Sequence, residues 1–233
     1  MKVAILYSGG KDSNYALYEA QKKGWDVRYL LSIKPTRTDC YLFHFATVEH
    51  TPKLAEMAGI KHVLKTCSVA DPVQEAEIVK KAVEEQEHID AVILGGVGLQ
   101  ETQIRSVRNA LSSLGIEVFP SHAELTEEES MINMINLGFK FMITQYATDG
   151  LNQSWLGKEI TKESFAELQS LSLKHGFNLL GEGGYYDTLV IGSPCFNGKE
   201  LSIITSNKVQ ESAYSGHLII TEAAIVPLQK ISQ

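Results

Sequence analysis

The chain has 233 residues, a net charge of −7, 44% hydrophobic residues and 21% charged residues. This composition is ordinary for a soluble globular protein. It disfavours a broad nucleic-acid groove, and no apolar run approaches the ~18 residues that a membrane span needs.

The three cysteines Cys40, Cys67 and Cys195 are far apart and form no CxxC pair. A disulfide framework or a zinc site is therefore poorly supported, and a reducing, cytoplasmic setting is expected.

Strands and helices alternate through the first half of the chain. Apolar runs that are typical of buried parallel strands lie at residues 2–7, 27–33, 62–66, 89–96 and 116–120. Helical spacing lies between them, in segments that end at Gly24 and at residues 52–58, 72–86 and 101–114. The alternation predicts an α/β fold, with a doubly wound, mainly parallel sheet that carries helices on both faces.

After about residue 125 the rhythm changes. Two helices are predicted, one after residue 125 and one over 162–176 with Thr161 as its N-cap, and the acidic run 127–129 is expected to be favoured by the helix dipole. Strands are predicted at residues 139–146, 185–192, 200–207, 208–213 and 217–226. This half is therefore expected to be a smaller C-terminal α+β domain, which places a domain of 1–125 before one of 126–233.

The turn after the first strand reads Ser8-Gly9-Gly10-Lys11-Asp12-Ser13 and opens directly into a helix. Glycines let successive main-chain amides point into one concavity, and a helix start adds N–H donors and partial positive charge. Phosphate is the expected guest, with Lys11 neutralising its oxygens and Asp12 holding Mg²⁺. The alternative is an ordinary glycine turn whose serine or aspartate caps the helix.

The turn resembles the pyrophosphate loop of the N-type ATP pyrophosphatases. It is not a Walker A loop, because Asp12 stands where that motif has Ser or Thr. The resemblance implies ATP as substrate, cleavage between the α- and β-phosphates, and release of pyrophosphate.

Three further segments, CYLFH at 40–44, WLGKEI at 155–160 and GEGGYYDTLV at 181–190, are similar to the diphthine–ammonia ligase family. That resemblance covers essentially the whole chain, and it implies amidation of diphthine, a modified histidine on elongation factor 2, with ATP and ammonia. The last of these segments departs from the family pattern at two positions, because Tyr185 replaces an acid and Asp187 a glutamate. Residues 102–106 and 120–122 depart from it as well. The acceptor half is thus less well matched than the nucleotide half.

The expected site has two parts, an ATP-binding domain over 1–125 and an acceptor-binding domain over 126–233. The residues expected to bind ATP are Ser8, Gly9, Gly10, Lys11, Asp12, Ser13, Ser32, Gly95 and Gly96. The residues expected to bind the acceptor are Glu182, Gly183, Gly184, Tyr186, Asp187 and Thr188. Lys11 and Glu182 are the expected catalytic residues, Glu182 by binding ammonium or taking its proton.

Two assignments keep an alternative, and one further residue, His44, is expected to be structural. Ser32 is either a nucleotide contact or an exposed loop serine, Gly95 and Gly96 either admit the adenine or ribose or form an ordinary strand end, and His44 is expected to be a core or hydrogen-bonded histidine. Ammonia itself, or a separate protein that supplies it, is the expected nitrogen source, because residue 2 is lysine rather than a glutaminase cysteine.

Other functions remain open at this point. A sulfur-transfer or reductase member of the superfamily would need paired cysteines or a C-terminal cysteine motif, which the sequence lacks. A non-catalytic nucleotide-binding regulator and an enzyme with a different acceptor are the remaining alternatives.

Overall fold

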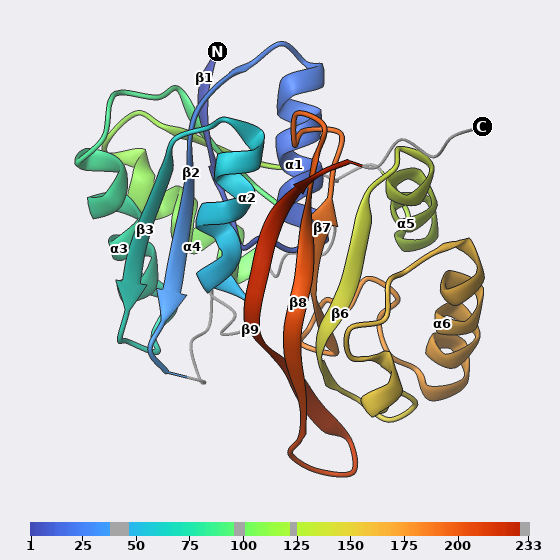
Figure 1. Ribbon diagram of the computed structural model, residues 1–233. Coiled ribbons are helices and arrows are strands. Elements are labelled where there is room, and N and C mark those ends of the chain that lie inside the picture. Colours follow the sequence, from blue (N-terminus) through green and yellow to red (C-terminus); the bar gives the residue numbers. More distant parts are fainter. Residues whose placement is uncertain (38–46, 96–100, 122–124, 229–233) are drawn as a thin grey trace. The chain divides into compact units, whose positions relative to one another are not determined.

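The computed structural model describes residues 1–37, 47–95, 101–121 and 125–228 (Figure 1). It divides into two compact units, one of Met1–Glu56 and Ile60–Thr126 and the other of Glu127–Gln233 and Met57–Gly59. Each unit is described separately below.

The first unit is built on a five-stranded parallel sheet of order β3-β2-β1-β4-β5. Its strands are β1 (Lys2–Leu6), β2 (Asp26–Pro35), β3 (His62–Cys67), β4 (Ala91–Leu94) and β5 (Glu117–Pro120). Its helices are α1 (Lys11–Lys22), η1 (Val48–His50), α2 (Thr51–Ala58), α3 (Pro72–Glu84) and α4 (Glu101–Ser112). The predicted doubly wound α/β fold is confirmed.

Alternation along the strands gives the sheet two apolar faces. Ala4, Leu31 and Val92 pack with α3 and α4 in one buried cluster. Val3 and Ile5 point the other way, because neighbouring strand residues face opposite sides, and α1 contacts β1, β2 and β4. Strand and helix therefore bury each other's apolar surface, which contributes roughly 25 cal/mol per Å² removed from water.

Local signals start and stop these elements as the sequence indicates. Asp71 caps α3 by accepting a hydrogen bond from the N–H of Gln74 at 2.9 Å, and Pro72 occupies the first turn. All five strands begin and end within two residues of the predicted runs, and β4 is the one that is shorter than predicted by two residues at each end.

The second unit combines helices with an antiparallel sheet. Its elements are α5 (Glu127–Asn136), β6 (Lys140–Ala147), η2 (Gln153–Trp155), α6 (Lys162–His175), β7 (Tyr186–Gly192), β8 (Lys199–Gln210) and β9 (Ser215–Pro227). Strand β6 pairs with both β7 and β9, and β8 joins β7 to β9, so the sheet closes on itself. The predicted α+β character is confirmed.

One prediction in this unit is wrong. The runs 200–207 and 208–213 are not separate strands, because β8 continues from Lys199 to Gln210. Pairing with β9 extends from Lys199↔Pro227 to Gln210↔Gly216, with a register irregularity near Thr205. A continuous partner strand thus carries β8 through a polar stretch that looked like a break.

The expected cap of α6 is confirmed. The Thr161 hydroxyl accepts a hydrogen bond from the N–H of Ser164 at 3.3 Å, and the Ser164 hydroxyl accepts one from the N–H of Thr161 at 2.8 Å. None of the helices in the described parts of the chain combines the length and apolar character that crossing a bilayer requires.

Candidate active site

The glycine turn of residues 8–10 lies where the order of the parallel sheet reverses. The chain builds β1, β2 and β3 outward to one edge, then returns to place β4 on the other side of β1. Open α/β sheets bind ligands beyond the carboxyl ends of their strands at such a point. The turn and Gly95 follow the adjacent strands β1 and β4, so both lie at this edge, as predicted.

Two glycines give the turn its shape. Gly9 has φ +84°, a backbone conformation that disfavours side chains, and Gly10 is the N-cap of α1 with φ −75° and ψ 172°. No side chain caps α1 at this position. The first N–H groups of a helix have no carbonyl within the helix to bond, and they carry partial positive charge, so this end of α1 suits an anion.

The two serines lie inside the turn. The Ser8 hydroxyl accepts a hydrogen bond from the N–H of Gly10 at 3.3 Å and lies 3.3 Å from the Ser13 hydroxyl oxygen. The Ser13 hydroxyl donates to the Gly10 carbonyl at 3.1 Å. The predicted serine donors are thus brought together around Gly10.

Lys11 and Asp12 place opposite charges at the start of α1. The Lys11 side chain is only 3% exposed, and its Nζ lies 2.8 Å from Asp12 Oδ2, whereas the Asp12 side chain is 25% exposed. A buried ammonium beside an anion site interacts more strongly than an exposed one. The expected charge for neutralising phosphate is therefore present, held in place by Asp12.

Asp12 also fits the expected magnesium ion. Mg²⁺ is usually bound through one or two carboxylates, substrate phosphates and water rather than by a cage of protein ligands. Asp12 is such a single carboxylate, and the described residues contain no group of three or more His, Cys, Asp or Glu side chains that could hold a metal ion.

Asn14 organises the turn, although the sequence did not predict this role. Its side chain is fully buried, and its Nδ2 donates to the carbonyls of Gly9 at 3.1 Å and Gly10 at 3.0 Å. The Tyr7 hydroxyl donates to Asn14 Oδ1 at 2.8 Å. Asn14 therefore fixes which way the two glycine peptides face. The only sign of this role in the sequence is that Asn14 lies three positions before the core residue Leu17, on the same face of the helix.

Ser32 is not the exposed loop serine of the alternative, and its contact with the nucleotide stays a prediction. It is fully buried within β2 rather than in an exposed loop, and its hydroxyl donates to the Tyr7 carbonyl at 2.6 Å. Because that proton is committed, the contact with His62 Nε2 at 3.0 Å makes the histidine the donor. Burial lowers the pKa of His62. Ser32 thus braces the main chain before the turn, and its geometry gives no support to a direct nucleotide contact.

Gly95 is required by close packing. A Cβ on Gly95 would lie 2.5 Å from both the Asp12 carbonyl carbon and the Ser13 nitrogen. The absence of a side chain lets β4 end directly against the first turn of α1. The adenine or ribose contact stays a prediction, and Gly96 and His44 lie outside the described residues.

The second group of predicted residues belongs to the other unit. Gly183 and Gly184 are exposed, with φ +88° and +86°, and Glu182 precedes them. Three predicted acceptor residues follow in β7, namely Tyr186, Asp187 and Thr188. Asp187 pairs with Gln145 of β6.

Tyr185, which replaces an acid of the family pattern, has a packing role. Its ring lies 6.3 Å from that of Phe177, and its carbonyl accepts a hydrogen bond from the N–H of Ala147 at 2.8 Å.

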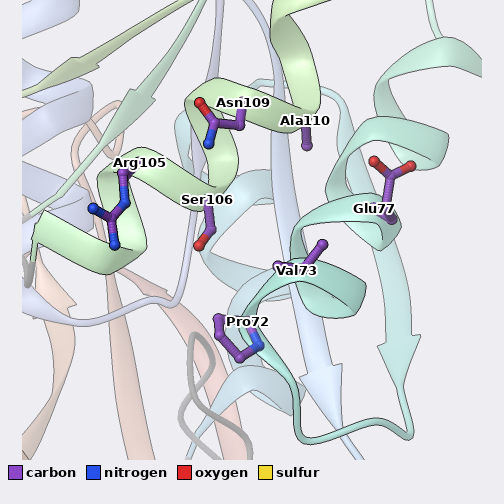
Figure 2. Close-up of a pocket in the computed structure, with 7 residues that line it drawn as sticks. All are labelled: Pro72, Val73, Glu77, Arg105, Ser106, Asn109 and Ala110. Carbon is purple, nitrogen blue, oxygen red and sulfur yellow. The ribbon is translucent and has the colours of Figure 1, made fainter.

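A pocket of about 400 Å³ lies between α3 and α4, and no predicted site residue lines it (Figure 2). Val73 and Ala110 line its apolar part, while Glu77 of α3 and Arg105 of α4 lie on opposite sides. The two charged groups do not converge on a common point in this pocket.

Comparison with known proteins covers both units. The model of the diphthamide synthase N-terminal domain matches residues 1–118, and that of the diphthamide synthase C-terminal domain matches residues 126–226. The chain is 27% identical to the diphthine–ammonia ligase of Mus musculus and 26% identical to that of Homo sapiens, in each case over 91% of this chain and 86% of the relative. It is 27% identical to the diphthine–ammonia ligase of Saccharomyces cerevisiae, over 88% of this chain but 35% of that longer protein.

Proposed function

The chain belongs to the diphthamide synthase family, and from this membership we propose that it is an ATP-dependent ligase that converts a carboxylate into an amide with ammonia. The acceptor is diphthine, a modified histidine of elongation factor 2, which is the substrate that the relatives' name implies. The observation that carries the proposal is the uncapped start of α1 with the buried Lys11 ammonium beside it, at the switch point of the sheet.

The chemistry requires activation of the acceptor. A carboxylate is a poor acyl donor because its leaving group would be oxide. Attack of a carboxylate oxygen on the α-phosphorus of ATP forms an acyl adenylate and breaks the bond to pyrophosphate. Ammonia then attacks the acyl carbon, loses a proton, and displaces AMP.

The residues of the first unit act on the triphosphate. The amides at the start of α1 bind the phosphate oxygens, and Lys11 compensates the charge that develops on departing pyrophosphate. The Ser8 and Ser13 hydroxyls join them by rotating away from their present acceptors, the Ser13 hydroxyl and the Gly10 carbonyl. Magnesium bound by Asp12 and the phosphates would add further positive charge there. Preorganised donors of this kind cost no reorganisation at the moment of reaction.

Glu182 serves the second half-reaction. Its carboxylate binds ammonium or accepts the proton that ammonia loses when the amide forms. Exclusion of water at this stage is essential, because water would otherwise hydrolyse the adenylate.

The test measures products. The protein is incubated with ATP, MgCl₂, ammonium chloride and diphthine-bearing elongation factor 2, and we expect AMP and pyrophosphate in equal amounts. Lys11→Ala should lower the rate on the order of 10²- to 10³-fold. Lys22→Ala on the same helix, where the lysine side chain is 63% exposed, should leave it unchanged. ADP and orthophosphate as the only products would refute the proposal.

A second candidate keeps the ATP chemistry and changes the acceptor. It is favoured by Tyr185, which packs on Phe177 instead of offering the acid of the family pattern. In that case AMP forms with a carboxylate in cell extract but not with elongation factor 2. Tight ATP binding without turnover on any acceptor would instead indicate a nucleotide-binding regulator.

A further inference from the structure

Two side chains of the second unit, Glu127 and Asn178, hold the segment that leads into the second glycine turn, residues 181–184. Asn178 Nδ2 donates to Glu127 Oε1 at 2.6 Å, and the N–H of Leu179 donates to Glu127 Oε2 at 2.9 Å. Both carboxylate oxygens of Glu127 therefore accept hydrogen bonds from residues that lie 51 and 52 positions later in the chain. Hydrogen bonds to an ionised acceptor are about twice as strong as neutral ones.

Asn178 passes this anchoring on to the turn itself. Its Oδ1 accepts hydrogen bonds from the N–H of Leu180 at 2.9 Å and of Glu182 at 3.1 Å. Its main-chain carbonyl accepts a third from the N–H of Gly181 at 3.0 Å. One asparagine thus fixes the main chain on both sides of Gly181, including the residue that bears the predicted catalytic carboxylate.

Further contacts close the same turn. The Tyr186 hydroxyl donates to the Leu179 carbonyl, and the N–H of Tyr185 donates to the Gly181 carbonyl at 3.2 Å. Leu179 and Leu180 are buried, so the segment is anchored by apolar packing as well. The Glu127–Asn178 pair is the link between this segment and α5, and it acts together with these contacts to hold the main chain from 178 to 182.

We propose that Glu127 and Asn178 are positioning residues, which hold the main chain of Glu182 so that its carboxylate meets ammonia in the second half-reaction. This inference rests on the proposed ligase function. It also extends the expectation for the acidic run 127–129. Glu127 lies in the first turn of α5, where the helix dipole favours it, but its carboxylate also organises the turn.

The donor and acceptor pattern permits an exchange of the two functional groups. Glu127→Gln alone brings an amide donor against another donor, either Asn178 Nδ2 or the N–H of Leu179. Asn178→Asp alone brings two carboxylates together. In the double variant, the new amide at position 127 donates to the new carboxylate at position 178, and every hydrogen bond of the native arrangement has a counterpart.

The experiment compares the wild type, both single variants and the double variant by steady-state kinetics. We expect each single variant to raise the KM for ammonia about tenfold or more, because small displacements of a catalytic group cost 10- to 100-fold. The double variant should return to within about threefold of the wild type, and the KM for ATP should stay unchanged throughout. Glu128→Gln, at an exposed position of the same helix, is the matched control.

Folding is controlled separately. If Glu127→Gln does not fold, Glu127→Asp retains the charge at the start of α5 but shortens the reach to Asn178, and it should show the same rise in the KM for ammonia. Single variants with the wild-type KM for ammonia, or a folded double variant without recovery, would overturn the inference.

A second readout separates this inference from the proposed function. Amide hydrogen exchange at Leu180 and Glu182 should be faster in each single variant and return to the wild-type rate in the double variant. If the wild type forms no AMP, the ligase proposal fails. The amide exchange rates still test whether Glu127 and Asn178 hold the main chain of Leu180 and Glu182. Equal exchange in all four proteins would overturn it.

Discussion

Asn14 shows at the scale of one residue how the turn proposed to bind phosphate is made rigid. Its buried amide donates to two successive glycine carbonyls and accepts from Tyr7. With those carbonyls held on the side of Asn14, the peptide planes of Gly9 and Gly10 have little freedom, and the anion site is formed before ATP arrives. Preorganisation of this kind lowers the cost of binding.

We predict that Asn14→Asp weakens ATP binding. The carboxylate cannot donate to the carbonyls of Gly9 and Gly10, and it adds negative charge beside the phosphates. Unsatisfied buried groups cost about 1–3 kcal/mol, so the Kd for a nonhydrolysable ATP analogue should rise roughly 10- to 100-fold in titration calorimetry. Asn207→Asp adds the same charge at an exposed position of β8 and is the control. Wild-type affinity in Asn14→Asp would contradict the role of Asn14.

Residue roles could be predicted from the sequence only as far as a local motif reaches. The serines, glycines, Lys11 and Asp12 are recognisable because they are contiguous. A role of Asn178 and Glu127 in the turn could not be predicted, because their contact depends on how α5 and the segment before β7 are brought together. The exposed-loop alternative for Ser32 is wrong for the same reason, since its burial results from the pairing of β2 with β1 and β3.

At the scale of elements, two glycines near the end of α6 separate the cost of conformation from the cost of contact. Gly176 has φ +75°, and a Cβ added there would meet nothing within 4 Å. Gly181 has φ +77°, but a Cβ there would lie 2.4 Å from the Tyr186 carbonyl oxygen. The two positions therefore share a left-handed backbone and differ in the space available.

We predict that Gly176→Ala lowers the free energy of unfolding by about 1 kcal/mol, the cost of a left-handed alanine. Gly181→Ala should cost about 1–3 kcal/mol more, because the main chain of β7 must move to admit the methyl group. Urea denaturation measures both values. Equal losses would show that the turn yields easily and that its main chain is not fixed.

The element pattern itself was largely predictable, and its failures have a common cause. Apolar runs and caps identified the parallel strands, and parallel topology then placed the first glycine turn and Gly95 at one edge of the sheet. The ends of elements depend on partners that periodicity does not reveal. Strand β8 extends through Ser206 and Asn207 because β9 pairs with it, and β4 stops at Leu94 beside β5.

At the scale of the whole molecule, both units match models of the same family, and the predicted residues divide between them. The nucleotide group lies in the first unit and the acceptor group in the second. Such a division suits a reaction of two steps, in which one set of groups stabilises departing pyrophosphate and another handles ammonia.

The cysteines of the chain bear on the source of the nitrogen that enters the amide. Hydrolysis of glutamine by a cysteine enzyme needs an accessible thiolate. In the described parts of the chain the cysteines are Cys67 and Cys195, and both are buried. Burial raises the pKa of Cys195 to about 11. A higher pKa disfavours the thiolate, which rules against Cys195 as the nucleophile.

We therefore predict that ammonium chloride supports AMP formation by the isolated chain and that glutamine does not. Cys195→Ser should leave the ammonia-dependent rate unchanged, and Cys40→Ser provides the same check for the cysteine outside the described residues. Both rates are measured at pH 8 with equal total nitrogen donor. The concentration of unprotonated ammonia rises with pH, and so does the ionised fraction of a thiol. A rate that rises with pH therefore does not distinguish ammonia from glutamine as the donor. Any glutamine-dependent turnover would contradict the prediction, and its loss in either variant would make that cysteine the nucleophile.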